Sequence, residues 1–292
     1  MEEFIKYFYN INIEKKSEKD NRVILKSKYK KYQLINYEKD PNKLYKKYIV
    51  LKNNGICCHD IILNKNGNIL SNYDSKNYLL LRENITAIQV ITENEILSSN
   101  LILNYKEDLN VSDKWQLKND YYEEEINKVY KENKFIKESF DYYLGLGELS
   151  ISILNYINYN NIMYYMQHDR LNVDETLVEF YNPINIVIDN RVRDIALYIK
   201  SNFFENSISL DKIKKIINLV NLNSDEAIFL IARLVYPDYY YDICDSIINE
   251  NYNSYKLINC IKKSSTYEEL IKDIYNYLYK IYNLPKIEFL FK

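Results

Sequence analysis

Hydrophobic and polar positions divide the chain into a first part of short strands and a second part of helices. Between turn residues, β-rich runs predict strands at 22–28, 32–37, 56–63, 68–70 and 78–81. Asp40 and Pro41 begin a helix between the second and third strands, and Gly55 follows its end. The dipeptide Asn66-Gly67 predicts a hairpin turn. The first 105 or so residues therefore predict a small antiparallel sheet with one helix.

From about Thr86 the apolar positions recur at helical spacing. Helices are expected at 109–130, 135–157, 193–204, 210–219, 224–235, 239–249 and 266–282, the last with a capping box at Thr266 and Glu269. Within this part, the runs 176–180 and 185–189 flank the turn Tyr181-Asn182-Pro183 and predict a lone β-hairpin. The expected fold is α+β with two lobes. A β-rich N-lobe covers 1–84, and a mainly helical C-lobe covers 85–292, with the hairpin region at about 163–200.

Composition limits the possible functions. The chain has 292 residues, 39 Lys+Arg and 41 Asp+Glu, and its 47% hydrophobic content is too high for a disordered protein. Only 4 glycines are present, and no glycine-rich dinucleotide or phosphate loop occurs. We attribute the 32 tyrosines to an AT-rich genome. With charges of both signs interspersed and no long apolar run, we expect no nucleic-acid partner, no membrane span and a cytoplasmic location.

The four cysteines do not form a recognisable metal or disulfide pattern. They comprise one adjacent pair, Cys57-Cys58, and the single residues Cys244 and Cys260. Cys57-Cys58-His59 has the wrong spacing for one tetrahedral zinc site. We therefore expect Cys57 and Cys58 to be a buried pair on a strand.

Several strings resemble bacterial spore-coat kinase-like proteins of the aminoglycoside phosphotransferase and choline kinase superfamily. In chain order they are Phe140–Leu149 (FDYYLGLGEL), His168–Leu171 (HDRL), Asn185–Asp189 (NIVID), Arg193–Ala196 (RDIA) and Ala232–Pro237 (ARLVYP). Each string alone is a weak signal, but their order extends over nearly the whole chain. The resemblance implies a protein-kinase-like fold with the remnant of a catalytic loop at the hairpin.

Phosphoryl transfer needs a base near the acceptor hydroxyl. By the resemblance, His168, Asp169 and Arg170 occupy the H-x-D triplet, and Arg170 takes the place of the base. A guanidinium group stays protonated and cannot accept a hydroxyl proton. Asp169 could replace it only if the loop shifted by one residue, and we interpret His168 as a packed structural histidine.

The other requirements are a phosphate cover, a cation on the phosphates and carboxylate or amide ligands for Mg²⁺. The turn Tyr29-Lys30-Lys31, between the first two predicted strands, contains no glycine, and Ile35 or Asn36 stands where a lysine is needed. By the resemblance, Asp189 and Glu175 take the metal-ligand places. Asp189 could equally cap the turn before Arg191. Asp194 is implied to be a structural carboxylate.

These substitutions predict a catalytically inactive kinase-like protein, or pseudokinase, without a cofactor. Such a protein would act as a scaffold or interaction component with protein partners, associated with the spore coat if the source forms spores. Two alternatives remain. One is a divergent small-molecule phosphotransferase that uses ATP, Mg²⁺, a hydroxyl acceptor and the residues Asp169, Asp189 and Glu175. The other is nucleotide binding without turnover.

Overall fold

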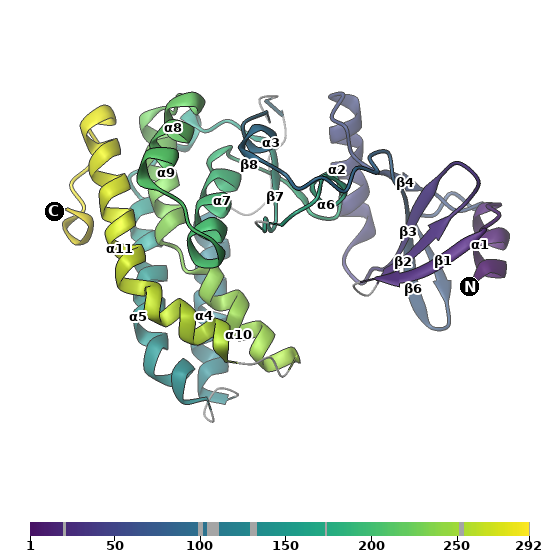
Figure 1. Ribbon diagram of the computed structural model, residues 1–292, viewed down its shortest axis with the longest axis horizontal. Helices are drawn as coiled ribbons and strands as arrows, with labels where there is room; N and C mark the ends of the chain where they lie inside the picture. Colours follow the sequence, from purple (N-terminus) through teal and green to yellow (C-terminus); the bar gives the residue numbers. More distant parts are fainter. Residues whose placement is uncertain are drawn as a thin grey trace. The chain divides into compact units, whose positions relative to one another are not determined.

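The computed structural model has an α+β architecture, and the described residues form two compact units (Figure 1). The structure describes residues 1–19, 22–98, 102–103, 111–128, 133–172, 174–250 and 254–291. The sheet unit comprises 1–92, 168–170 and 174–188. The helical unit comprises 93–167, 171–173 and 189–292. The expected antiparallel sheet followed by a mainly helical region is confirmed.

The sheet unit contains six antiparallel strands in the order β1-β2-β3-β6-β4, with β5 paired to β6. Its elements are α1 (Glu2–Tyr9), β1 (Lys15–Lys19), β2 (Arg22–Lys26), β3 (Lys31–Asn36), α2 (Pro41–Asn53), β4 (Asp60–Ile62), β5 (Leu70–Tyr73), β6 (Lys76–Arg82) and α6 (Leu177–Phe180).

Both faces of this sheet are covered, because β6 is apolar on both sides. Successive side chains of a strand point to opposite faces. Leu80 packs with Phe4 and Ile5 of α1, whereas Leu79 and Leu81 pack with Leu44 of α2. The helix α2 begins as expected, with Asp40 accepting a hydrogen bond from the Asn42 N–H and Pro41 in the first position.

The helical unit is built around α9, whose residues are almost all buried. Its helices are α3 (Glu93–Ser98), α4 (Val111–Lys128), α5 (Lys134–Leu154), α7 (Val192–Glu205), α8 (Leu210–Val220), α9 (Ser224–Val235), α10 (Asp238–Glu250) and α11 (Tyr255–Tyr282), with short 3-10 turns η2 (Tyr159–Asn161) and η3 (Glu288–Leu290). Helices α5, α7 and α11 pack against α9. None of the described helices combines the length and the apolar run that a bilayer crossing needs.

The hairpin of the C-terminal part differs from the prediction. Strand β7 (Tyr165–His168) pairs with β8 (Ile186–Asp189) in a two-stranded sheet. The run 176–180 was expected to be the first strand. In the structure its residues form the single-turn helix α6, and Thr176 caps this helix by accepting a hydrogen bond from the Glu179 N–H. In a run of only five residues, the spacing of the hydrophobic positions cannot distinguish a strand from a helix.

Four further expectations were wrong. The N-terminal residues form α1 and β1, so the Tyr29-Lys30-Lys31 segment lies between the second and third strands; β1 ends at Lys19 and β2 begins at Arg22, and the two residues between them lie outside the described part of the chain. Asn66-Gly67 does form a tight turn, in which the Gly67 N–H donates to the Asn64 carbonyl at 2.8 Å, but strands β4 and β5 each pair with β6 and not with each other. Helix α11 begins before the predicted cap at Thr266. Finally, Cys57 is exposed, and neither it nor the buried Cys58 belongs to a strand.

Two glycines of α5 should respond oppositely to substitution by alanine. A Cβ on Gly147 would lie 2.7 Å from the side chain of the buried Asn119, which accepts a hydrogen bond from the Tyr241 hydroxyl and cannot easily move. A Cβ on the exposed Gly145 would meet nothing within 4 Å. We expect Gly147→Ala to lower the free energy of unfolding by about 1–3 kcal/mol and Gly145→Ala to raise it by about 0.5–1 kcal/mol. Urea unfolding measures both, and equal effects would contradict this packing.

Candidate functional site

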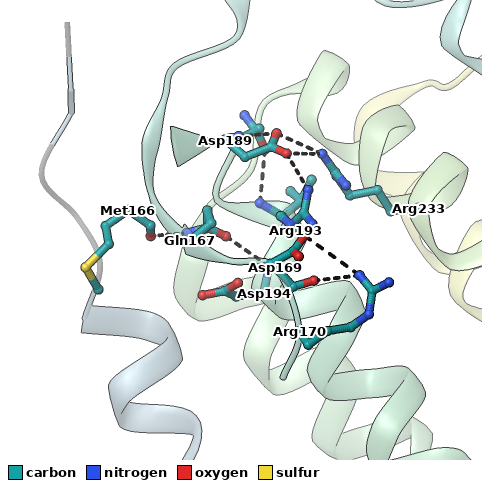
Figure 2. A network of polar contacts seen from close by, with 10 residues as sticks. Met166, Gln167, Asp169, Arg170, Asp189, Arg193, Asp194 and Arg233 are labelled. Carbon is teal, nitrogen blue, oxygen red and sulfur yellow. Dashed lines mark hydrogen bonds and ion pairs between the residues drawn. The ribbon is translucent and has the colours of Figure 1, made fainter. Parts of the chain in front are cut away.

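The candidate metal ligand Asp189 lies at the end of β8, and its carboxylate is already surrounded by donors (Figure 2). Nη2 of Arg233 lies 2.8 Å from both carboxylate oxygens. Nη1 of Arg193 lies 3.0 Å from Oδ2, and the Asn190 N–H donates to Oδ1 at 2.7 Å. Two guanidinium groups and one backbone amide therefore satisfy a carboxylate in a residue that is only 9% exposed.

Arg233 is a buried cation in an otherwise apolar helix. It belongs to α9, and its guanidinium carbon lies 4.5 Å from the ring centroid of Phe229 and 5.8 Å from that of Trp115. A charge in such surroundings costs much free energy unless it is paired. Burial alone would raise the pKa of the Asp189 carboxyl, but Arg233 and Arg193 outweigh burial and hold that pKa below its ordinary value. Asp189 is therefore an ionised counter-ion of Arg233.

A second ion pair fixes the other end of the same helix. Arg191 donates from Nε to Oε1 of Glu226 at 3.0 Å and from Nη2 to Oε2 at 2.6 Å. Glu226 also completes the capping box of α9 with Asn223. Glu226 and Arg233 are seven residues, or about two helical turns, apart on α9. On α9, the carboxylate of Glu226 therefore pairs with Arg191, and the guanidinium group of Arg233 pairs with Asp189.

The positions of the predicted catalytic loop belong to the sheet unit. His168 is buried, and its Nε2 donates to the Phe180 carbonyl at 2.8 Å, which fits a packed structural histidine. The N–H of Asp169 donates to the Asn185 carbonyl at 2.7 Å. Arg170 is exposed and turns back on its neighbour: Nη1 lies 3.0 Å from the Asp169 carbonyl oxygen and 3.8 Å from its Oδ1.

The remaining predicted residues lie in different units. Glu175 is half-buried in the sheet unit, where its carbonyl accepts from the Ile91 N–H at 2.8 Å. Asp189 belongs to the helical unit, so the two carboxylates are not part of one unit. Asp194 is buried, and its N–H donates to Oε1 of Gln167 at 2.9 Å within the helical unit.

The residues around Asp189 do not fit a magnesium site. Mg²⁺ needs several free oxygen ligands in octahedral geometry. Across the described parts of the chain, no three His, Cys, Asp or Glu side chains come close enough together to hold a metal ion. Both oxygens of Asp189 are instead bound by cations, which would repel Mg²⁺.

The chain segment 174–188 is held within the sheet unit by hydrogen bonds and an ion pair. The backbone N–H of the buried His59 donates to the Tyr181 carbonyl at 2.9 Å, and its Nε2 donates to the Val178 carbonyl at 2.8 Å. Nη1 of Arg22 lies 2.7 and 2.6 Å from the two carboxylate oxygens of Glu179. The segment that follows the predicted catalytic loop is thus tied to the sheet.

Comparison with solved structures defines the class of fold. An aminoglycoside phosphotransferase from Alicyclobacillus acidocaldarius subsp. acidocaldarius is similar with a TM-score of 0.61 and 8% identity over 92% of this chain and 93% of that chain. Choline kinase LicA from Streptococcus pneumoniae has a TM-score of 0.54 and 11% identity over 94% and 98% of the two chains. At these identities the similarity shows that the fold is kinase-like.

The family follows from the sequence. Residues 113–274, more than half of the chain, match the family described as "Spore coat putative kinase YutH". The chain belongs to this family of kinase-like proteins. No curated protein sequence matches it.

Sequence reasoning missed the two arginines that bind Asp189. Arg233 was visible as the single cation in the run Ala227–Val235, which is otherwise apolar. A lone charge within a buried helix indicates a buried counter-ion. Arg193 lies four residues after Asp189, but Asp189 itself ends a strand, so no helical spacing predicted their contact.

Replacing Arg233 should destabilise the fold strongly. Arg233→Met leaves Asp189 buried with Arg193 as its remaining cation, and breaking a buried ion pair on one side costs about 3–5 kcal/mol. We expect a loss at the lower end of that range in urea unfolding. The control Lys215→Met removes an exposed cation from α8 and should change stability by less than about 0.5 kcal/mol. A nearly neutral Arg233→Met would contradict the assigned pairing.

His59 should make the sheet unit less stable in mild acid. Burial lowers the pKa of His59, although its hydrogen bond to Val178 and the carboxylates of Glu83, Glu179 and Asp60 oppose the shift. Folding therefore favours neutral His59. Its contribution to stability is complete above the unfolded pKa of about 6.5 and is lost as the pH falls toward the lower folded pKa.

We expect the stability difference between pH 7.5 and 5.0, measured by urea unfolding, to be smaller in His59→Gln than in the wild type. An unchanged difference would show that His59 titrates alike in the folded and unfolded chains.

Proposed function

We propose that this protein is a catalytically inactive kinase-like protein that acts as a scaffold or interaction component. The observation that carries the proposal is the Asp189 carboxylate, whose two oxygens are bound by Arg233 and Arg193. By the resemblance, this carboxylate stands where kinase-like enzymes hold Mg²⁺. A cation that is part of the protein now neutralises it.

A second observation supports inactivity. The place of the catalytic base holds Arg170, which cannot accept a proton from a hydroxyl group. The neighbouring Asp169 forms an ion pair with the same guanidinium group at 3.8 Å. That contact directs the Asp169 carboxylate toward a cation of the protein.

The sheet unit offers little for a nucleotide. Kinases place a lysine on the third strand, where it contacts the phosphates. Here Ile35 of β3 packs with the apolar cluster beneath α2. The sequence that links β1 to β2, Lys19-Asp20-Asn21-Arg22, contains no glycine that would bring backbone N–H groups close to a phosphate. Neither ATP nor Mg²⁺ is expected to bind.

The rival function is a divergent small-molecule phosphotransferase that uses ATP and a hydroxyl acceptor. It would need Asp169 as base and Asp189 with Glu175 as metal ligands, so Asp189 would have to exchange its arginines for Mg²⁺. The solved neighbours include a spectinomycin phosphotransferase with ADP and spectinomycin bound, with a TM-score of 0.54 and 12% identity over 95% and 96% of the chains. This structural similarity is the reason to test the protein for phosphotransferase activity.

The family description names the spore coat, and this name is the basis for a proposed location of the protein. We propose protein partners, a cytoplasmic location during synthesis and association with the coat if the source forms spores.

Thermal unfolding with ATP and Mg²⁺ tests the proposal. A ligand at one hundred times its dissociation constant stabilises a protein by about 2.7 kcal/mol, so we expect no shift of the unfolding temperature at millimolar MgATP. A shift together with ATP turnover would overturn inactivity, and a shift without turnover would indicate nucleotide binding alone. The variant Asp189→Ala/Arg233→Met serves as control, because it removes the carboxylate without leaving Arg233 unpaired. A true metal site would lose the shift in this variant.

A further inference from the structure

Three lysines stand directly opposite one another at one end of the six-stranded sheet. The strand register pairs Lys15 of β1 with Lys26 of β2, and Lys26 with Lys31 of β3. Residues opposite in an antiparallel pair point to the same face with their Cβ atoms about 4.5–5.5 Å apart. Like charges placed in this way destabilise a sheet. The fold therefore carries a concentration of charge that its own stability does not require.

The turn after β2 adds further lysines to the same end. The N–H of Ser27 donates to the Lys30 carbonyl at 2.9 Å, and Lys28, Tyr29 and Lys30 are all exposed. Tyr29 is 84% exposed, and Nζ of Lys28 lies 5.1 Å from its ring centroid. We call Lys15, Lys26, Lys28 and Lys30 the basic sheet end.

The basic sheet end lacks counter-ions in the part of the chain that the structure describes. Lys31 forms an ion pair with Glu83 at 3.0 Å, but none is formed there by Lys15, Lys26, Lys28 or Lys30. The neighbouring Glu14 donates its backbone N–H to the Lys26 carbonyl at 2.8 Å. The whole chain has a net charge of -2, so this end is a local excess of positive charge on a slightly acidic protein.

Protection of a sheet edge does not account for these lysines. Edge strands often carry lysine, which prevents another chain from pairing with them. That explains Lys15 on the edge strand β1. It does not explain Lys26, because β2 is paired on both sides, nor Lys28 and Lys30 in the turn.

We propose that the basic sheet end binds a short acidic segment of a partner protein. Three neighbouring strands span only about 10 Å at about 4.8 Å per interval, which matches three or four carboxylates of one segment better than a broad surface. The exposed acid Glu14, next to Lys15, would repel an extended anionic surface such as a membrane or a nucleic acid. The exposed ring of Tyr29 can cover the aliphatic part of the segment.

An acidic partner segment would be one of the partners of the interaction role proposed above, on which this assignment rests. Its test uses no nucleotide, so failure of one proposal does not decide the other.

The probe is a fluorescent peptide with six consecutive glutamates, compared with the same peptide carrying glutamines, and binding is measured by fluorescence anisotropy. We expect saturable binding of the glutamate peptide that weakens as salt is added. The variant Lys15→Glu/Lys26→Glu/Lys28→Glu/Lys30→Glu should bind at least ten-fold more weakly. The matched control is Lys39→Glu/Lys43→Glu/Lys46→Glu/Lys76→Glu, which makes the same charge change elsewhere in the sheet unit and should retain binding within two-fold.

No saturable binding, or an equal loss in both variants, would overturn the proposal. Tighter binding to phosphatidylglycerol vesicles or to a single-stranded oligonucleotide would also overturn it. The single variant Lys26→Gln gives a second readout that does not depend on the quadruple variant folding. Because it relieves repulsion from Lys15 and Lys31, it should raise the unfolding temperature while it weakens peptide binding several-fold. A variant that changes neither would count against the proposal.

Discussion

The buried ion pair between Asp189 and Arg233 is the interaction on which the helical unit depends. It joins the end of β8 to the middle of the core, because Arg233 belongs to α9, against which α5, α7 and α11 pack. Neither charge is tolerable alone at such burial. The Arg191–Glu226 pair repeats the arrangement about two turns away with the signs reversed. Opposite charges at both points fix the direction and the register of α9 against the residues that follow β8.

Asp189 pairs with arginines in this protein, whereas phosphoryl transfer on a kinase-like fold needs carboxylates that bind a metal ion. In phosphoryl transfer a metal ion brings positive charge to a carboxylate and to the phosphates together. In this protein arginine brings positive charge to the carboxylate of Asp189. Under the proposed function, Arg170 takes the place of the catalytic base, so both places would carry permanent cations of the protein where an enzyme needs a removable ion or a proton acceptor. Under the proposed function, the fold presents surfaces to other proteins, and the lysines of β1, β2 and the turn after β2 form one such surface.

The parts of the fold that follow from local patterns could be predicted from the sequence, and those that depend on pairing could not. The cap at Asp40, the apolar run of β6 and the helices α7 to α9 have clear local signals, and the motif order indicated the kinase-like class. Residues 176–180 were predicted to be the strand that pairs with 185–189, whereas in the structure the partner of β8 is β7, which lies earlier in the chain. Asp189 was singled out as a metal ligand or a turn cap. Its real partner, Arg233, is 44 positions away, and only tertiary structure brings the two together.

The most direct test of the account is a titration of the wild-type protein with Mn²⁺ in the presence and absence of ATP, followed by electron paramagnetic resonance of the free ion. Mn²⁺ replaces Mg²⁺ at oxygen sites and binds them at least as tightly. Because the oxygens of Asp189 are bound by Arg233 and Arg193, the account predicts that the protein removes no Mn²⁺ or Mn²⁺–ATP from solution at micromolar to millimolar concentrations. Stoichiometric binding of Mn²⁺–ATP that disappears when Asp189 and Arg233 are replaced together would contradict it.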